Sequence, residues 1–252
     1  MNTKEALYNF CLRFGDNNII LGQRLAEWCS KGPILEEDLA ITNISLDLFG
    51  QSENIFEYAA ELEGKGRSPD NLAFLRDERH YYNNLLIEQP NGDFAFTMVR
   101  QFLFSAFAKH LYEALCSLKD EKLSALAAKA LKEIKYHLRH SSEWVIRFGK
   151  GTEESHQRVQ YALNELWMFT EDLFLMNEAD KKLIQEGISV NLDNLYSKWE
   201  NTVDEIIREA ELKVPENTSM ITGGINGTHT EHLGHILCEM QYLQRAYPEA
   251  KW

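Results

Sequence analysis

"HLYEALCSLKDEKLSALAAKALKEIKYHLRH" spans residues 110–140 and carries apolar residues at three- and four-residue intervals on both sides of a short polar break. This period is typical of amphipathic helices. The break at Lys119–Asp120 is only long enough for a tight turn, and helices joined so closely lie antiparallel. The stretch therefore predicts a hairpin of two long helices, about Phe94–Leu118 and Glu121–Phe148.

The same helical period extends over the rest of the chain, so we expect an all-α protein. Two long hairpins connected by a crossover that contains a helix match a ferritin-like four-helix bundle with additional C-terminal helices. We expect a single domain over 1–252, with the core bundle at about 3–150 and packing helices at about 153–252. The other expected helices are Thr3–Ser30, which could break at Gly15–Asn18; one from after Pro33 to Glu63; one with Ser68 as N-cap and Pro69 as first residue, to Glu88; and Glu154–Met176, Asp193–Lys213 and Thr230–Tyr247.

Composition limits the classes of function. The 252 residues carry a formal net charge of −13, and no strong cluster of Lys and Arg appears, so we expect no nucleic-acid partner. No apolar stretch approaches the roughly 18 to 20 residues of a membrane helix, and the N-terminus lacks a secretory signal, so we expect no membrane partner and a cytoplasmic location. The four cysteines form no C-x-x-C pair and are expected to be free thiols.

One polar pair in the predicted bundle suggests a metal site. Glu133 precedes His137 by four residues, so both side chains lie on one helix face and could hold a metal. Ferritin-like di-iron proteins use one carboxylate on each of two helices and Glu-x-x-His on each of the other two. Here Ile134 stands where the glutamate of that motif belongs, so this helix alone cannot decide whether a centre forms.

The other long helices argue against a di-iron centre. Asp47 is followed by Gly50 at three residues and by Gln51 at four, so no histidine completes the motif there. Ser105 stands near an expected carboxylate. The first helix offers Asp16 or the two asparagines after it. At most three of six positions keep a plausible ligand, and iron needs several anionic oxygen donors.

We therefore expect no catalytic residue and no bound metal in this chain. Asp47, Gln51, Ser105, Glu133 and His137 are interpreted as remnants of a di-iron site. Glu133 and His137 are then buried polar groups whose expected hydrogen-bond partners are Asp47 or the lysines at 132 and 135, because buried polar groups are generally hydrogen-bonded.

A second candidate metal site lies in "THTEHLGHILCE", where His229, His232 and His235 recur every three residues. Three histidines could bind zinc. Steps of three drift by about 60° around a helix, and the H-E-x-x-H pattern is missing. We favour a helix that begins at Thr228 or Thr230, with its His and Glu side chains in structural hydrogen bonds or partner contacts.

Several long blocks then point to a known family. "DLAITNISLDLFGQSENIFEYAAEL", "FLRDERHYYNNLLIEQPNGDFAFTMVRQ", "KALKEIKYHLRHSSEWVIRFGKGTEES" and "HTEHLG" with "EMQYLQR" closely resemble the structural, non-catalytic subunits of the ring-1,2-phenylacetyl-CoA epoxidases of phenylacetate degradation. The resemblance extends over nearly the whole chain.

The resemblance implies a subunit that pairs with a homologous catalytic subunit. That partner would carry the di-iron centre, and a separate reductase would supply electrons for epoxidation of the aromatic ring. The resemblance also implies an incomplete ligand set in this chain. This agrees with Gln51, Ser105 and Ile134, which stand where the di-iron motif would have metal ligands. Two alternatives remain open: an independent metalloenzyme with an altered di-iron or zinc site, and a stand-alone homodimer.

Overall fold

The computed structural model describes residues 1–248 and 250. Over this part of the chain it contains eleven α-helices and three short 3-10 helices, and no strand. The all-α prediction is confirmed. The chain divides into two compact units: Met1–Pro90 with Asn177–Leu183 and Gly223–Trp252, and Asn91–Met176 with Ile184–Thr222.

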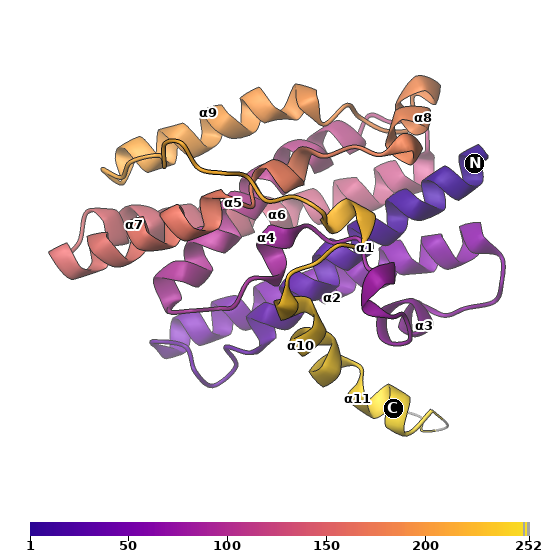
Figure 1. Ribbon diagram of the computed structural model, residues 1–252, viewed down its shortest axis with the longest axis horizontal. Helices are drawn as coiled ribbons and strands as arrows, with labels where there is room; N and C mark the ends of the chain where they lie inside the picture. The colour runs from indigo at the N-terminus through magenta and orange to yellow at the C-terminus, as the bar shows by residue number, and fades with distance from the viewer. Residues whose placement is uncertain (249, 251–252) are drawn as a thin grey trace. The chain divides into compact units, whose positions relative to one another are not determined.

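The first unit is built on a hairpin of two long helices, α1 (Thr3–Ala26) and α2 (Leu35–Glu63), which run antiparallel in Figure 1. They pack closely because small residues line the contact. A Cβ atom at Gly15 would overlap the ring of Phe56, and the Ser52 hydroxyl donates to the Gly15 carbonyl oxygen at 3.0 Å. Ser45 donates in the same way to the Gly22 carbonyl, at 2.8 Å.

The expected break in the first helix is absent, because α1 runs unbroken through Gly15–Asn18. The polar side chains of this stretch are buried and bind other segments, so they do not end the helix. The expected end at Ser30 was too late by four residues. The prediction of Ser68 as N-cap of the third helix is confirmed, since its Oγ accepts the Asn71 N–H at 3.2 Å.

The crossover segment differs from the single helix expected over residues 69–88. It contains α3 (Pro69–Phe74), the 3-10 turn η1 (Glu78–His80) and α4 (Leu85–Glu88), with irregular chain between them. Helical hydrogen bonds are replaced by tertiary ones, because Tyr82 N–H donates to Asp16 and Asn84 N–H to Asn17 on α1. The unit is completed by most of α8 (Glu178–Glu186), by η3 (Gly224–Asn226), and by α10 (Glu231–Met240) and α11 (Tyr242–Ala246), which replace the one helix expected there.

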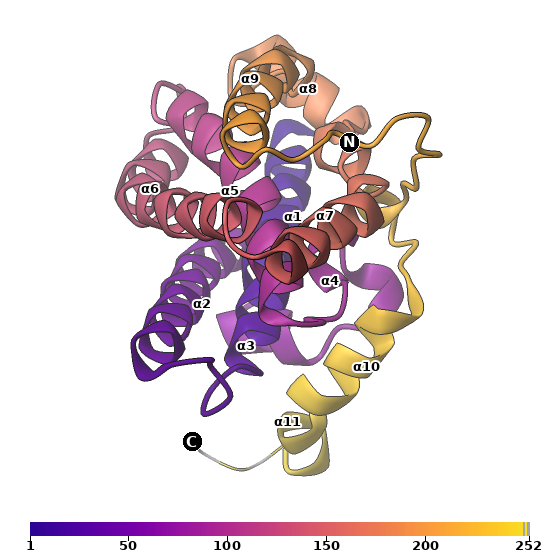
Figure 2. The ribbon, with the colours of Figure 1, turned by 90° about the vertical axis from the view of Figure 1, so that its left-hand side faces the viewer.

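The second unit is built on the hairpin that the local sequence pattern predicts, α5 (Phe94–Leu115) and α6 (Glu121–Gly149). Asp120 in the turn caps α6 by accepting the Leu123 N–H at 2.8 Å. Helices α7 (Glu153–Trp167) and α9 (Asp193–Glu209) pack against α5 and α6 (Figure 2), and η2 (Glu171–Phe174) follows α7. Both α7 and α9 end earlier than expected.

Aromatic side chains form the core of this second unit. Trp199 of α9 is 1% exposed and donates its indole N–H to the Leu103 carbonyl of α5 at 3.0 Å. Trp167 and Phe174 contact its ring. Each unit thus contains one long antiparallel hairpin of the kind from which a ferritin-like bundle is made, and the fold class is confirmed. The single domain over 1–252 stays a prediction, and residues 249, 251 and 252 lie outside the described part.

Candidate functional site

The five residues interpreted as remnants of a di-iron site lie on three long helices. Asp47 is half-buried and Gln51 is buried, one turn apart on α2 in the first unit. Ser105 is buried on α5, and on α6 Glu133 is half-buried and His137 fully buried, all three in the second unit. Three of the five side chains are buried, as expected for residues that face the interior of a helical bundle.

The chemistry of these positions does not fit a di-iron centre. A complete ligand set has four carboxylates and two histidines, whereas the five residues supply two carboxylates, one imidazole, an amide and a hydroxyl. The Ser105 hydroxyl already accepts a hydrogen bond from Gln101 Nε2 at 2.9 Å. The geometry within either unit does not test whether these residues are remnants of a di-iron site, so this interpretation stays a prediction. The expected contacts of Glu133 and His137 also stay predictions.

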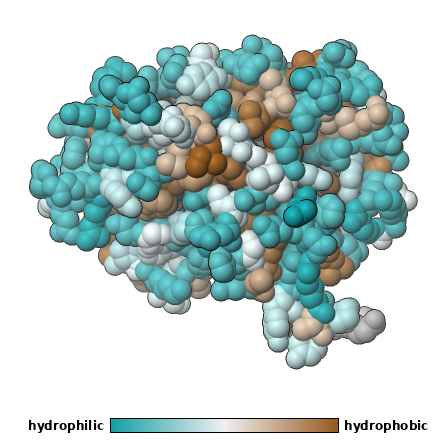
Figure 3. Space-filling model, viewed as in Figure 1, coloured by the Kyte–Doolittle hydropathy of each residue, from teal (hydrophilic) through white to brown (hydrophobic). Residues whose placement is uncertain are grey.

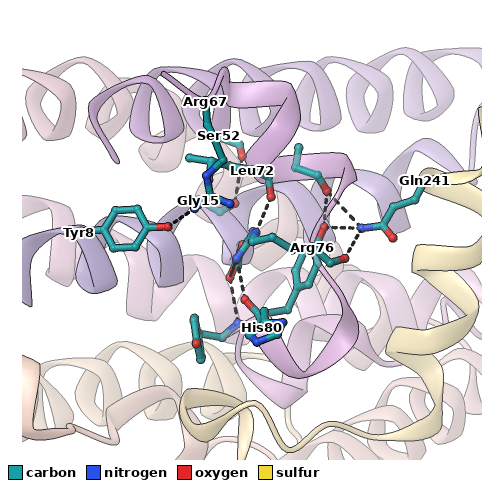
Figure 4. A network of polar contacts seen from close by, with 12 residues as sticks. Tyr8, Gly15, Ser52, Arg67, Leu72, Arg76, His80 and Gln241 are labelled. Atoms are coloured by element: carbon teal, nitrogen blue, oxygen red, sulfur yellow. Dashed lines mark hydrogen bonds and ion pairs between the residues drawn. The ribbon is translucent and has the colours of Figure 1, made fainter. Parts of the chain in front are cut away.

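A buried ion pair lies at the centre of the first unit (Figure 4). The Arg76 guanidinium of the crossover binds the Asp16 carboxylate of α1, and it also donates to the Leu72 and His80 carbonyl oxygens. Its Cζ atom lies over the ring of Tyr81, 4.3 Å from the centroid. Burial opposes charge on Arg76, but the Asp16 carboxylate outweighs it and keeps the pKa of Arg76 above its ordinary value. This pair fixes the irregular crossover to α1.

A second buried cluster surrounds Glu88, whose side chain is fully buried. Its carboxylate accepts hydrogen bonds from Asn83 Nδ2 at 2.8 Å, His229 Nδ1 at 2.9 Å, and the backbone N–H and hydroxyl of Thr230 at 2.7 and 2.8 Å. Its backbone carbonyl accepts two bonds from Arg24 of α1. One carboxylate therefore joins α4 to the start of α10.

The geometry also sets the charge on His229. Its Nε2 faces the Tyr81 carbonyl oxygen at 2.8 Å, while Nδ1 faces the Glu88 carboxylate. Both partners are acceptors, so both ring nitrogens must donate, which requires the imidazolium form. Burial by itself would lower the pKa of His229, but the hydrogen bond and charge of Glu88 outweigh burial and raise it.

The three histidines of the candidate zinc site are therefore used differently. Both ring nitrogens of His229 have hydrogen-bond partners, whereas His232 is half-buried and His235 exposed on α10. Within the described residues, no group of three or more His, Cys, Asp or Glu side chains is arranged to hold a metal. The preferred interpretation, a structural hydrogen bond, is confirmed for His229. The expected cap is only partly right, because Thr230 precedes α10 but its hydroxyl binds Glu88.

A third buried pair joins α1 to α8. Arg13 binds both carboxylate oxygens of Asp180, at 2.7 and 2.8 Å, and both side chains are less than 10% exposed. Sequence reasoning missed this pair and the pairs of Asp16 and Glu88, because the partners lie 167, 60 and 141 residues apart. The sequence does show charged residues within the apolar faces of the predicted helices. Because buried charges need partners, such residues indicate that buried ion pairs exist.

The face drawn in Figure 3 is mostly hydrophilic over α7 and α9. None of the helices in the described part of the chain is long and apolar enough to span a membrane.

Fold and residue chemistry together define a ferritin-like, all-α protein whose candidate metal ligands do not match a di-iron set. A family model described as phenylacetic acid catabolic protein matches residues 1–252, so the chain belongs to that family. It is 51% identical over 243 residues to one of the subunits of the 1,2-phenylacetyl-CoA epoxidase of Escherichia coli strain K12, and the alignment covers 96% of this chain and 98% of that protein. The resemblance to epoxidase subunits is confirmed.

Proposed function

We propose that this chain is the non-catalytic, structural subunit of a multicomponent ring-1,2-phenylacetyl-CoA epoxidase. It pairs with a homologous di-iron catalytic subunit in aerobic phenylacetate catabolism, and a separate reductase supplies the electrons. The observation that carries the proposal is the near full-length match to a subunit of the Escherichia coli epoxidase. The donor types at Gln51 and Ser105, an amide and a hydroxyl, support a chain without its own di-iron centre.

The physical role of such a chain is to present a rigid surface to the catalytic subunit. Buried, fully hydrogen-bonded charges such as Asp16 and Glu88 hold the irregular crossover and the C-terminal segment in one arrangement. A surface that is ordered before association loses less conformational entropy when it binds. The chain thus supports the geometry of its partner's active site and takes no chemical step itself.

The proposal is tested by co-expression with the catalytic subunit of the same organism. The two chains should co-purify, and removal of this chain should abolish or strongly reduce epoxidation of phenylacetyl-CoA with reductase, NADPH and dioxygen present. Elemental analysis of the isolated chain, expressed with added iron and zinc, should find less than stoichiometric metal. Stoichiometric metal bound to the isolated chain, or full epoxidase activity without it, would contradict the proposal.

The remaining expectations about partners and location are part of the same proposal. A di-iron cofactor is expected in the partner and none in this chain, no nucleic acid or membrane is expected to bind, and a cytoplasmic location is expected. The alternative of an independent metalloenzyme gains no support from the arrangement of His229, His232 and His235.

A further inference from the structure

The outward face of α2 carries exposed leucines. Leu35, Leu39 and Leu46 are 71%, 55% and 59% exposed. Their spacings of four and seven residues place them on one side of the helix. Single exposed leucines are ordinary, but a row of three on one helix face is typical of a surface that another protein covers.

A cavity opens one turn after the last of these leucines. It has a volume of about 480 Å³, and its lining includes Gly50 and Glu53 of α2, Asp70 of α3, and the side chains of Phe56 and Phe74. α2 and α3 pack together in this unit (Figure 2). A Cβ atom on Gly50 would meet no atom within 4 Å, so the helix surface at the cavity is open. The cavity combines aromatic walls with carboxylates.

The carboxylates beside this cavity have no counter-ion in the described part of the chain. Glu53 and Asp70 line the cavity, and Glu57 follows Glu53 by one turn; all three are exposed and none takes part in an ion pair there. α2 contains no Lys or Arg from Leu35 to Glu63. By contrast Glu63, at the end of the helix, is paired with Arg67. The acidic residues near the cavity are thus available to a cation from outside.

We infer that this part of α2 is the surface that binds the catalytic subunit of the epoxidase, and that the cavity receives an Arg or Lys side chain of that subunit. We call Leu35, Leu39, Leu46, Gly50 and Glu53 with the cavity the α2 face. The aliphatic stem of the partner side chain lies against the aromatic walls, and its cation meets Glu53 and Asp70. This inference rests on the proposed function, because it takes the partner to be a subunit of that complex.

A second copy of this chain fits the α2 face less well than a different subunit. Two copies joined through this face would bring acidic surfaces of the same sign together, and each chain carries a net charge of −13. A partner with apolar side chains opposite the leucines and a cation opposite Glu53 complements both halves of the surface.

The test is the dissociation constant between the full-length chain and its cognate catalytic subunit, measured by titration calorimetry at low and moderate salt. Leu46→Asp, Gly50→Phe and the double variant Glu53→Lys/Asp70→Lys should each weaken binding by about tenfold or more, because they affect the centre of the contact. The charge reversal should also reduce the dependence of binding on salt.

Matched controls separate this surface from general effects. Leu243→Asp introduces an aspartate at an exposed leucine of α11, and Glu205→Lys reverses an exposed charge of α9. Both variants should stay within about twofold of wild type, as exposed positions away from a contact usually do. Thermal unfolding of every variant checks that the fold is retained.

The outcomes distinguish this inference from the proposed function. If the wild-type chain binds and the α2-face variants bind equally well, the inference is overturned and the proposed function stands. If the wild-type chain does not bind the catalytic subunit, both are overturned. If sedimentation shows a dimer of this chain that Leu46→Asp abolishes while binding to the catalytic subunit is unchanged, the face belongs to a second copy and the inference is wrong.

Discussion

The two units of this protein are stabilised by different means. In the first unit, buried ion pairs join α1 to irregular or short segments, as Asp16 does with Arg76 and Arg13 with Asp180. In the second, long helices pack through an aromatic cluster around Trp199. Long helices satisfy their own backbone groups and need only an apolar face, whereas irregular chain needs polar partners for its N–H and C=O groups. The contrast is therefore a consequence of how regular each segment is.

The largest expected effect comes from breaking the central ion pair of the first unit. Arg76→Ala removes the cation beside the fully buried Asp16 and the donors to the Leu72 and His80 carbonyls. Truncating one member of a buried pair leaves an uncompensated charge, so we expect a loss of about 3–5 kcal/mol in the free energy of unfolding. Urea denaturation measures it.

The control for this prediction is Arg158→Ala, which breaks an exposed pair with Glu154. It should leave the urea midpoint unchanged, because solvent screens such pairs. Equal losses for the two variants would show that buried charges do not hold the crossover.

A pair of glycine substitutions compares the packing of the two units. Gly149, at the end of α6, has no room for a side chain, because a Cβ atom would overlap the Ala210 carbonyl. Gly149→Ala should destabilise the protein by about 1–3 kcal/mol. Gly50→Ala on α2, where the added atom meets nothing, should stabilise it by about 0.5–1 kcal/mol through helix propensity. The urea midpoints of the two variants should shift in opposite directions from that of wild type. Shifts in the same direction would contradict the packing at these two glycines.

The aromatic core of the second unit offers a smaller, conservative test. Trp199→Phe keeps an aromatic ring but removes the indole N–H that binds the Leu103 carbonyl. We expect a loss of about 1–2 kcal/mol from the hydrogen bond and the reduced volume. Denaturant unfolding measures this loss, and Tyr161→Phe at an exposed site of α7 serves as the control. A loss no larger than that of the control would mean that Trp199 does not anchor the core.

The same contrast explains which features the sequence reveals. The hairpin of α5 and α6 follows from a local period and a local turn, so the sequence predicts the bounds of both helices to within three residues. The N-cap at Ser68 was likewise local. The crossover could not be predicted, because its geometry depends on Asp16 and Asn17, more than 60 residues away in the chain. Charged residues inside a helical apolar face show that a partner exists but not where it is.

The candidate site shows the same limit. Gln51 and Ser105 could be recognised from sequence as poor ligands, because that judgement needs only residue chemistry and a helix period. The bonds of His229 to Glu88 and Tyr81 could not, because they depend on where the C-terminal segment meets the crossover. Histidines at regular spacing look alike in a sequence, although the structure gives one of them two buried partners.

The smallest expected effect is a change in how stability depends on pH. The pKa of folded His229 is raised above its ordinary value, so the imidazolium stabilises the folded state fully below about pH 6.5. This contribution is lost as the pH rises through the raised pKa of the folded state. The free energy of unfolding of wild type should therefore fall across that window by more than that of His229→Gln. His235→Gln, at an exposed site on α10, should keep the wild-type slope. Equal slopes for wild type and His229→Gln would mean that the Glu88 carboxylate does not hold a charged imidazole.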